Sequence, residues 1–146
     1  MKRSIIKRIK CLALIVLVMF VVHGINVLMN GWLNVFGIIP GSMAHWFHVF
    51  TAPFIHADLA HLTNNVVGLV VFSSLCLARS IGFYIFASVF IISLTGCFVW
   101  LFGREAIHIG ASGWVFGLWS LSLALAWFDR RFINILTACL VFFFYG

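Results

Sequence analysis

The sequence predicts an all-α protein whose helices cross a membrane several times, and three observations support that prediction. Hydrophobic residues make up 64% of the 146-residue chain and charged residues only 8%, whereas an ordinary soluble domain is about half apolar and about a quarter charged. Apolar runs long enough for membrane helices recur along the chain, and the basic residues gather at one predicted membrane face. Together these observations exclude a soluble protein and predict a single polytopic transmembrane helix bundle, residues 1–146.

A transmembrane helix needs about 20 mainly apolar residues, and five segments approach or reach this length. The first begins like a secretory signal peptide, but no small-x-small cleavage site follows, which favours an uncleaved first helix. The last segment has 14 residues, which at about 1.5 Å per residue is too short for a core of about 30 Å. The predicted spans are Cys11–Met29, Ala57–Leu77, Gly82–Phe102, Ser112–Phe128 and Phe132–Tyr145.

The distribution of charge predicts the direction of the helices. Five of the nine basic residues lie in segment 1–10, and if this segment is cytoplasmic, Arg79 and the basic residues of segment 129–131 also face the cytoplasm. Only Arg104 then lies outside. We therefore expect a multi-pass protein of a bacterial inner or cell membrane with a cytoplasmic N-terminus. The uncharged segment 30–55 becomes a long extracytoplasmic loop lying in the membrane interface.

The remaining composition bears on partners and cofactors. The net charge of +6 could indicate nucleic acid, but no patch of interleaved basic and aromatic residues follows the N-terminal cluster, so none is expected. Four cysteines lie in apolar stretches at long spacings, so they are interpreted as buried hydrophobic residues rather than a metal site or disulfide framework. They are Cys11, Cys76, Cys97 and Cys139.

Polar residues at membrane depth are costly and indicate either function or contacts between helices. The segment 56–65, HADLAHLTNN, places His61 and Asn65 four residues apart, and hence on one face of the second helix. Both side chains can donate hydrogen bonds. The alternative is that they only join neighbouring helices. His56 lies five residues before His61, a poor spacing for two metal ligands on one helix face.

A second polar cluster, GASG at residues 110–113, puts Ser112 where a loop enters the fourth span. A serine at this position can simply cap the helix. Gly113 and Gly117, however, form a GxxxG pattern, which would let another helix approach directly beneath Ser112. A serine nucleophile would need such an approach if its general base came from another span.

The predicted topology brings the two clusters together. The second and fourth spans begin at the same membrane face, so His61, Asn65 and Ser112 can occupy one depth in the membrane. A nucleophile would then face two side-chain donors suited to stabilising the oxyanion of a tetrahedral intermediate.

These motifs resemble those of the rhomboid family of intramembrane serine proteases. The similarity runs from Phe36 to Gly146 and includes FGIIP in the first loop, FTAPFIHADLAHLTNN at the second helix and IHIGASGWVFG at the fourth. The resemblance implies that Ser112 is the nucleophile, and that His61, Asn65 and the Ser112 backbone N–H stabilise the oxyanion. The supporting residues would be His56, Gly110, Gly113 and Gly117.

The resemblance also implies the substrates. Rhomboid proteases cut transmembrane segments of other proteins near the outer membrane face, where small or helix-destabilising residues let the peptide unwind. We therefore expect transmembrane protein substrates and the lipid bilayer as partners. Neither a cofactor nor a metal is expected.

The sequence departs from the family pattern at three places. Phe47 and His48 stand where many rhomboids have a Trp–Arg pair, and Phe116 stands where a tyrosine often packs against the catalytic histidine. The family's general base is a histidine on a sixth helix, which follows a tyrosine–glycine pair similar to Tyr145–Gly146. We therefore expect about five of the six core helices, no general base and an inactive fragment.

Two alternatives stay open. The base could lie within the chain, and His108, four residues before Ser112, is then the best candidate, because the spacings of His23, His45 and His48 do not tie them to the serine. Otherwise the protein could be a non-catalytic rhomboid-like protein that binds membrane-protein clients. Such a protein has no need of an intact serine and oxyanion pair, so the protease is favoured.

Overall fold

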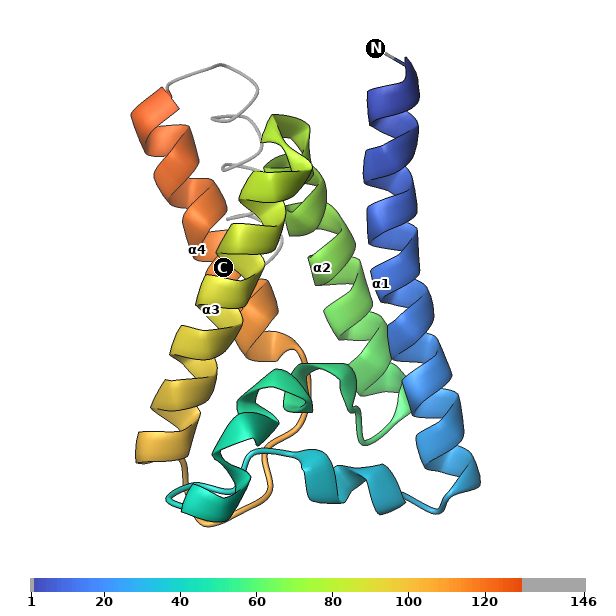
Figure 1. The fold of residues 1–146 in the computed structure, drawn as a ribbon, viewed down its shortest axis with the longest axis vertical. Helices are drawn as coiled ribbons and strands as arrows, with labels where there is room; N and C mark the ends of the chain where they lie inside the picture. The colour runs from blue at the N-terminus through green and yellow to red at the C-terminus, as the bar shows by residue number, and fades with distance from the viewer. Residues whose placement is uncertain (1, 130–146) are drawn as a thin grey trace.

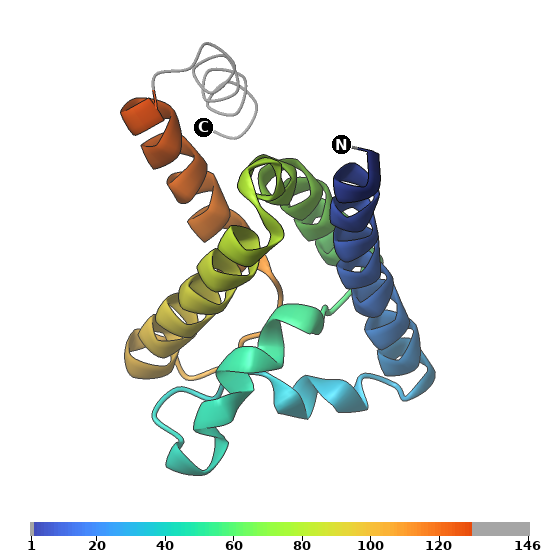
Figure 2. The ribbon, with the colours of Figure 1, turned by 45° about the horizontal axis from the view of Figure 1, so that its top comes forward.

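The computed structural model describes residues 2–129, in which the regular elements are helices. The four long helices are α1 (Lys2–Leu28), α2 (Leu59–Arg79), α3 (Ile81–Phe102) and α4 (Ser112–Asp129). The connection between α1 and α2 contains three short 3-10 helices, η1 (Trp32–Phe36), η2 (Met43–Phe50) and η3 (Ala52–Phe54). They form a layer across one end of the bundle (Figure 1). Figure 2 shows that this layer reaches from the end of α1 to the end of α3. The predicted all-α bundle is confirmed.

The helix boundaries differ from the predicted spans mainly at the N-terminus. The helix α1 already begins at Lys2, whereas the first span was expected to begin at Cys11, so residues 2–10 are part of the helix rather than a separate tail. The helices α1, α2 and α3 are long and apolar enough to cross a membrane, and α4 is a shorter apolar helix. The predicted fifth span, Phe132–Tyr145, lies outside the described residues.

Large apolar side chains cover the outside of the bundle. Leu14 on α1 is 60% exposed, and Phe86 and Phe102 on α3 are 72% and 75% exposed. In water, a continuous apolar surface of this kind would promote aggregation, whereas lipid tails are as apolar as the side chains themselves. The exposure pattern therefore fits a multi-pass membrane protein.

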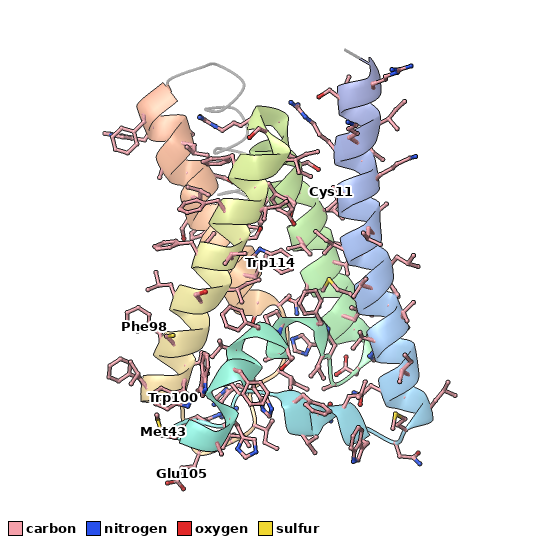
Figure 3. All side chains as sticks on the ribbon, viewed as in Figure 1. Cys11, Met43, Phe98, Trp100, Glu105 and Trp114 are labelled. Atoms are coloured by element: carbon pink, nitrogen blue, oxygen red, sulfur yellow. The ribbon has the colours of Figure 1, made fainter. Side chains whose placement is uncertain are left out.

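The core lies where α2 meets α3 and α4. Leu118, Phe72 and Trp114 are at most 4% exposed and belong to one apolar cluster, and Trp114 lies in the middle of the bundle (Figure 3). Inside this apolar region the Ser73 hydroxyl donates a hydrogen bond to the Tyr84 hydroxyl at 3.1 Å. Such a bond between membrane helices contributes about 0.6–2 kcal/mol, and here it fixes α2 against α3.

Polar side chains define the helix ends. The Asp58 carboxylate accepts a hydrogen bond from the backbone N–H of His61 at 2.7 Å and caps α2. The Ser80 hydroxyl accepts one from a backbone N–H in the first turn of α3. Each such cap contributes about 0.5–2 kcal/mol. At the far end of α2, the Arg8 guanidinium donates to the Ala78 carbonyl at 2.9 Å, which fastens the basic end of α1 to the α2–α3 turn.

The glycine notch formed by Gly113 and Gly117 faces α3. A Cβ at Gly113 would lie 3.1 Å from Thr95 Oγ1, and a Cβ at Gly117 would overlap Ile91 Cγ2. The sequence-based interpretation gave this notch to a helix that supplies the general base. That interpretation is wrong, because the helix in the notch is α3, which contains no histidine. A GxxxG pattern marks a surface that allows close approach, but it does not identify the neighbour.

Replacing Gly117 with alanine is expected to loosen the packing of α4 on α3, because the added methyl group overlaps Ile91. Overpacking of this kind costs about 1–3 kcal/mol. Gly24→Ala is the matched control, because Gly24 also lies within a helix and has no atom within 4 Å of its Cβ position. Thermal unfolding in detergent should show a lower midpoint for Gly117→Ala only. Equal midpoints would contradict the close contact.

Candidate active site

Backbone hydrogen bonds attach residues 103–111, which connect α3 to α4, to the first loop, the connection between α1 and α2. Ile38 and His108 form an antiparallel bridge with N···O distances of 2.8 and 2.9 Å. The Gly110 N–H donates to the Ala52 carbonyl at 3.0 Å. A Cβ at Gly37 would lie 2.6 Å from two neighbouring isoleucine side chains, so only glycine lets the segments approach this closely. The first loop therefore fixes the residues that lead into α4.

His61 and Asn65, from the first two turns of α2, both face this connection. A Cβ at Gly110 would lie 2.5 Å from His61 Nε2 and 3.5 Å from Asn65 Nδ2. Gly110 also has a φ of 109°, a backbone conformation that is open to glycine and rare for other residues. Two independent constraints thus require glycine here. Glycine at this position lets the backbone that enters α4 lie directly against both side-chain donors.

The side-chain donors of His61 and Asn65 form no hydrogen bond with any residue in the described part of the chain. Asn65 is 7% exposed, and its Nδ2 has no partner there. The His61 ring forms no hydrogen bond with these residues either. A buried polar group without a partner costs about 1–3 kcal/mol, and native structures keep few of them. The arrangement leaves two donors available to a group that enters the site.

Ser112 opens α4 two residues after Gly110. Its side chain is exposed, and within residues 2–129 its hydroxyl forms no hydrogen bond. It therefore does not act as the side-chain cap of α4, which was the alternative interpretation. Ser112 borders a cavity of about 130 Å³ between the first loop, α3 and α4, which Thr95 and His108 also line.

The His56 ring packs against the His61 ring. The two rings meet edge to face, with centroids 5.0 Å apart. His56 is completely buried, and neither of its ring nitrogens has a hydrogen-bond partner of good geometry among the described residues. Burial and then repulsion by His61 lower the pKa of His56 from its usual 6.5 to about 4, and the nearby Phe54 carbonyl offsets only part of this shift. At neutral pH His56 is therefore an uncharged ring packed against His61.

The histidines at positions 45, 48 and 108 form hydrogen bonds with groups other than Ser112. His48 Nδ1 donates to the Gly37 carbonyl at 3.0 Å and so anchors the first loop. His45 Nδ1 bonds a serine hydroxyl in the same loop. His108 Nε2 donates to the carbonyl of a residue four positions earlier at 3.0 Å. None of these rings forms a hydrogen bond with Ser112, although His108 lines the same cavity.

The face of α4 that carries Ser112 remains uncovered by the described helices. Phe116, one turn further on, is 55% exposed and contacts the Trp119 ring edge-on, with centroids 6.3 Å apart. Ser120, one more turn along, is also exposed, and its hydroxyl donates back to the Phe116 carbonyl. Ser112 thus begins a stripe of α4 that is open to lipid or to another helix.

The sequence of this chain matches a known protein family. The model of the Rhomboid domain matches residues 43–146. The chain belongs to the rhomboid family. This rhomboid is 33% identical over 95 residues to Rhomboid-like protein 11, chloroplastic, of Arabidopsis thaliana, a match that covers 62% of this chain and 34% of that protein.

Mycobacterial relatives match more of this rhomboid. It is 31% identical over 137 residues to uncharacterized proteins of Mycobacterium tuberculosis and Mycobacterium bovis, with 90% of this chain and 57% of each relative covered. A Mycobacterium leprae relative is 32% identical over 101 residues, covering 65% of this chain and 40% of its own. The rhomboid therefore spans 57% of the length of the M. tuberculosis and M. bovis relatives. No solved structure matches it significantly.

Gly110→Ala is expected to disrupt the site, because the new methyl group would lie 2.5 Å from His61 Nε2. Gly41→Ala is the matched control. Gly41 also has a positive φ, of 72°, but nothing lies within 4 Å of its Cβ position. The control therefore carries only the backbone penalty of about 1–2 kcal/mol, whereas Gly110→Ala adds a steric one. Thermal unfolding in detergent should rank Gly110→Ala below Gly41→Ala, and the opposite order would refute the close approach.

Replacing His56 with phenylalanine is expected to reduce the sensitivity of the fold to acid. Its pKa is about 4 in the folded protein, against 6.5 for an ordinary histidine. Between these pH values the unfolded chain binds a proton that the folded protein does not. Acidification from 6.5 towards 4 therefore destabilises the fold, by up to about 1.4 kcal/mol per pH unit, whereas the contribution is constant above 6.5.

Unfolding midpoints at about pH 7.5 and about pH 5 measure this effect. The drop on acidification should be smaller for His56→Phe than for the wild type. His45→Phe is the control, because His45 is exposed in the first loop. A drop for His56→Phe as large as that of the wild type would show that His56 is not the titrating group.

Proposed function

We propose that this rhomboid carries the nucleophile and the oxyanion-binding groups of a serine-type intramembrane endopeptidase. The main support is the buried Asn65 amide, which has no partner among the described residues and lies with His61 against Gly110. Two residues further on, Ser112 presents an exposed hydroxyl that is not used as a cap. If His61 and Asn65 only joined neighbouring helices, which is the alternative role, both side chains would be expected to have hydrogen-bond partners.

In the proposed reaction, Ser112 Oγ attacks the scissile carbonyl carbon and loses its proton to a general base. The carbonyl oxygen becomes an oxyanion, which accepts hydrogen bonds from His61 Nε2–H, Asn65 Nδ2–H and the Ser112 backbone N–H. The first turn of α4 adds unpaired backbone N–H groups and the positive end of the helix dipole. Collapse of the intermediate breaks the C–N bond, the base returns the proton to the leaving amine, and water then hydrolyses the acyl-enzyme.

The proposal requires a general base for Ser112, and none of the described histidines forms a hydrogen bond with it. The uncovered stripe of Ser112, Phe116 and Ser120 offers a surface on which a further helix could bring the base. His108 remains the candidate within the described part of the chain, since it lines the same cavity as Ser112.

The proposed substrates are transmembrane segments of other membrane proteins. Ser112 lies at the end of the bundle that carries the first loop, on the exposed face of α4. A peptide in a transmembrane helix keeps its carbonyl groups hydrogen-bonded within the helix, so it must unwind locally before Ser112 can reach a carbonyl carbon. Cleavage is therefore expected at small or helix-destabilising residues near this membrane face.

The test uses the rhomboid expressed in membranes from its own gene, with a tagged transmembrane reporter that has a small-residue, helix-destabilising segment near one membrane face. Ser112→Ala should abolish cleavage, because it removes the nucleophile. Ser120→Ala is the matched control, since it removes a hydroxyl from the same exposed face of α4 two turns away. Cleavage that survives in Ser112→Ala would refute the assignment of the nucleophile.

Variants of the oxyanion pair extend the same assay. His61→Ala and Asn65→Ala should each lower turnover by roughly 10- to 1,000-fold, as for other oxyanion donors. Unchanged turnover in both would remove the pair from the mechanism. If the wild type binds the reporter but never cleaves it, the non-catalytic, client-binding alternative replaces the protease.

A further inference from the structure

Two polar residues on α1 are buried against the rest of the protein. His23 is 8% exposed and Asn26 is 3% exposed, although residues 11–28 of α1 are otherwise strongly apolar. They are three residues apart and so share a helix face. Polar groups at this depth require partners. The family match begins at residue 43, so α1 lies outside the part of the chain that identifies it as a rhomboid.

His23 contacts the segment that leads into α2. Its Nδ1 lies 3.3 Å from the carbonyl oxygen of His56. Because a carbonyl only accepts, the ring must donate its Nδ1–H in this hydrogen bond. The contact joins α1 to the start of segment 56–58, a stretch without regular secondary structure of its own.

The segment 56–58 holds His61 at two points. The His56 ring meets the His61 ring edge to face, with centroids 5.0 Å apart. The Asp58 carboxylate accepts from the His61 backbone N–H at 2.7 Å. His61 Nε2 in turn faces Gly110. The orientation of the His61 imidazole therefore depends on the placement of segment 56–58.

We propose that His23 is a positioning residue, which holds segment 56–58 so that His61 presents its Nε2–H at Gly110. The inference rests on the proposed function, in which that N–H stabilises the oxyanion. Misplacing a catalytic group by about 1 Å can lower the rate by about 100-fold, so a contact that does not touch substrate still affects turnover. The three rings do not form a metal site, because no group of three suitable ligands exists among the described residues.

The contact is tested by separating loss of the hydrogen bond from loss of packing. His23→Phe keeps a buried ring and removes the donor, whereas His23→Gln keeps an N–H donor and serves as the rescue variant. Asn26→Leu is the matched control. It removes another buried polar contact between α1 and the first loop, in which Asn26 bonds Asn34 and the Leu33 N–H at 2.9 Å each. If His23→Phe does not fold, His23→Leu replaces it.

The first readout is ¹⁵N NMR of the histidine rings of the chain in detergent micelles, with the His61 signals assigned by their loss in His61→Gln. The wild type, His23→Gln and Asn26→Leu should show one His61 tautomer protonated at Nε2, and His23→Phe should show a mixture. An unchanged His61 spectrum in His23→Phe, or an equal change in Asn26→Leu, would overturn the proposal.

The second readout is cleavage of the reporter described above. His23→Phe should lower kcat by about 10- to 100-fold with little change in KM, and His23→Gln should recover most of the loss. A rise in KM alone would overturn a positioning role. The NMR result needs no substrate, so a wild type that never cleaves would refute the proposed function without deciding how His61 is oriented.

Discussion

The backbone of Gly110 lies so close to His61 and Asn65 that no side chain fits between them. This approach depends on the positive φ of Gly110 and on its hydrogen bond to Ala52. It also sets the position of Ser112, since only one residue separates Ser112 from Gly110. The candidate nucleophile and the two candidate donors therefore share one geometric constraint. The first loop, α2 and α4 are placed relative to one another at this point.

The sequence was sufficient to predict the features that depend on local pattern. Hydropathy located the helices from α2 to α4 to within a few residues, and helical periodicity placed His61 and Asn65 on one face. The partner of the glycine notch was not predictable, because Gly113 and Gly117 indicate a small surface and not the helix that packs on it. The contact of His23 with the His56 carbonyl was not predictable from the spacing of His23 to Ser112. The place of His23 three residues before Asn26 on an apolar helix was the available signal.

The shape of the first loop could not be predicted for a different reason. Its composition indicated an uncharged segment at the membrane surface, but its conformation depends on partners far along the chain. Ile38 pairs with His108, and the Trp100 indole donates to the Ser42 carbonyl. No local preference of residues 30–55 encodes these contacts. The placement of His48 on the Gly37 carbonyl likewise became visible only in three dimensions.

The pairing of Ile38 with His108 and of Ala52 with Gly110 also bears on the order of assembly. A chain is synthesised from its N-terminus, so α1, the first loop and α2 exist before residues 108–110 do. Until then, the polar backbone groups that Ile38 and Ala52 later use lack these protein partners. The loop can reach its final form only when the start of α4 arrives. The arrangement thus delays maturation of the candidate site until residues 108–112 have been synthesised, and an immature chain does not yet hold Ser112 close to His61 and Asn65.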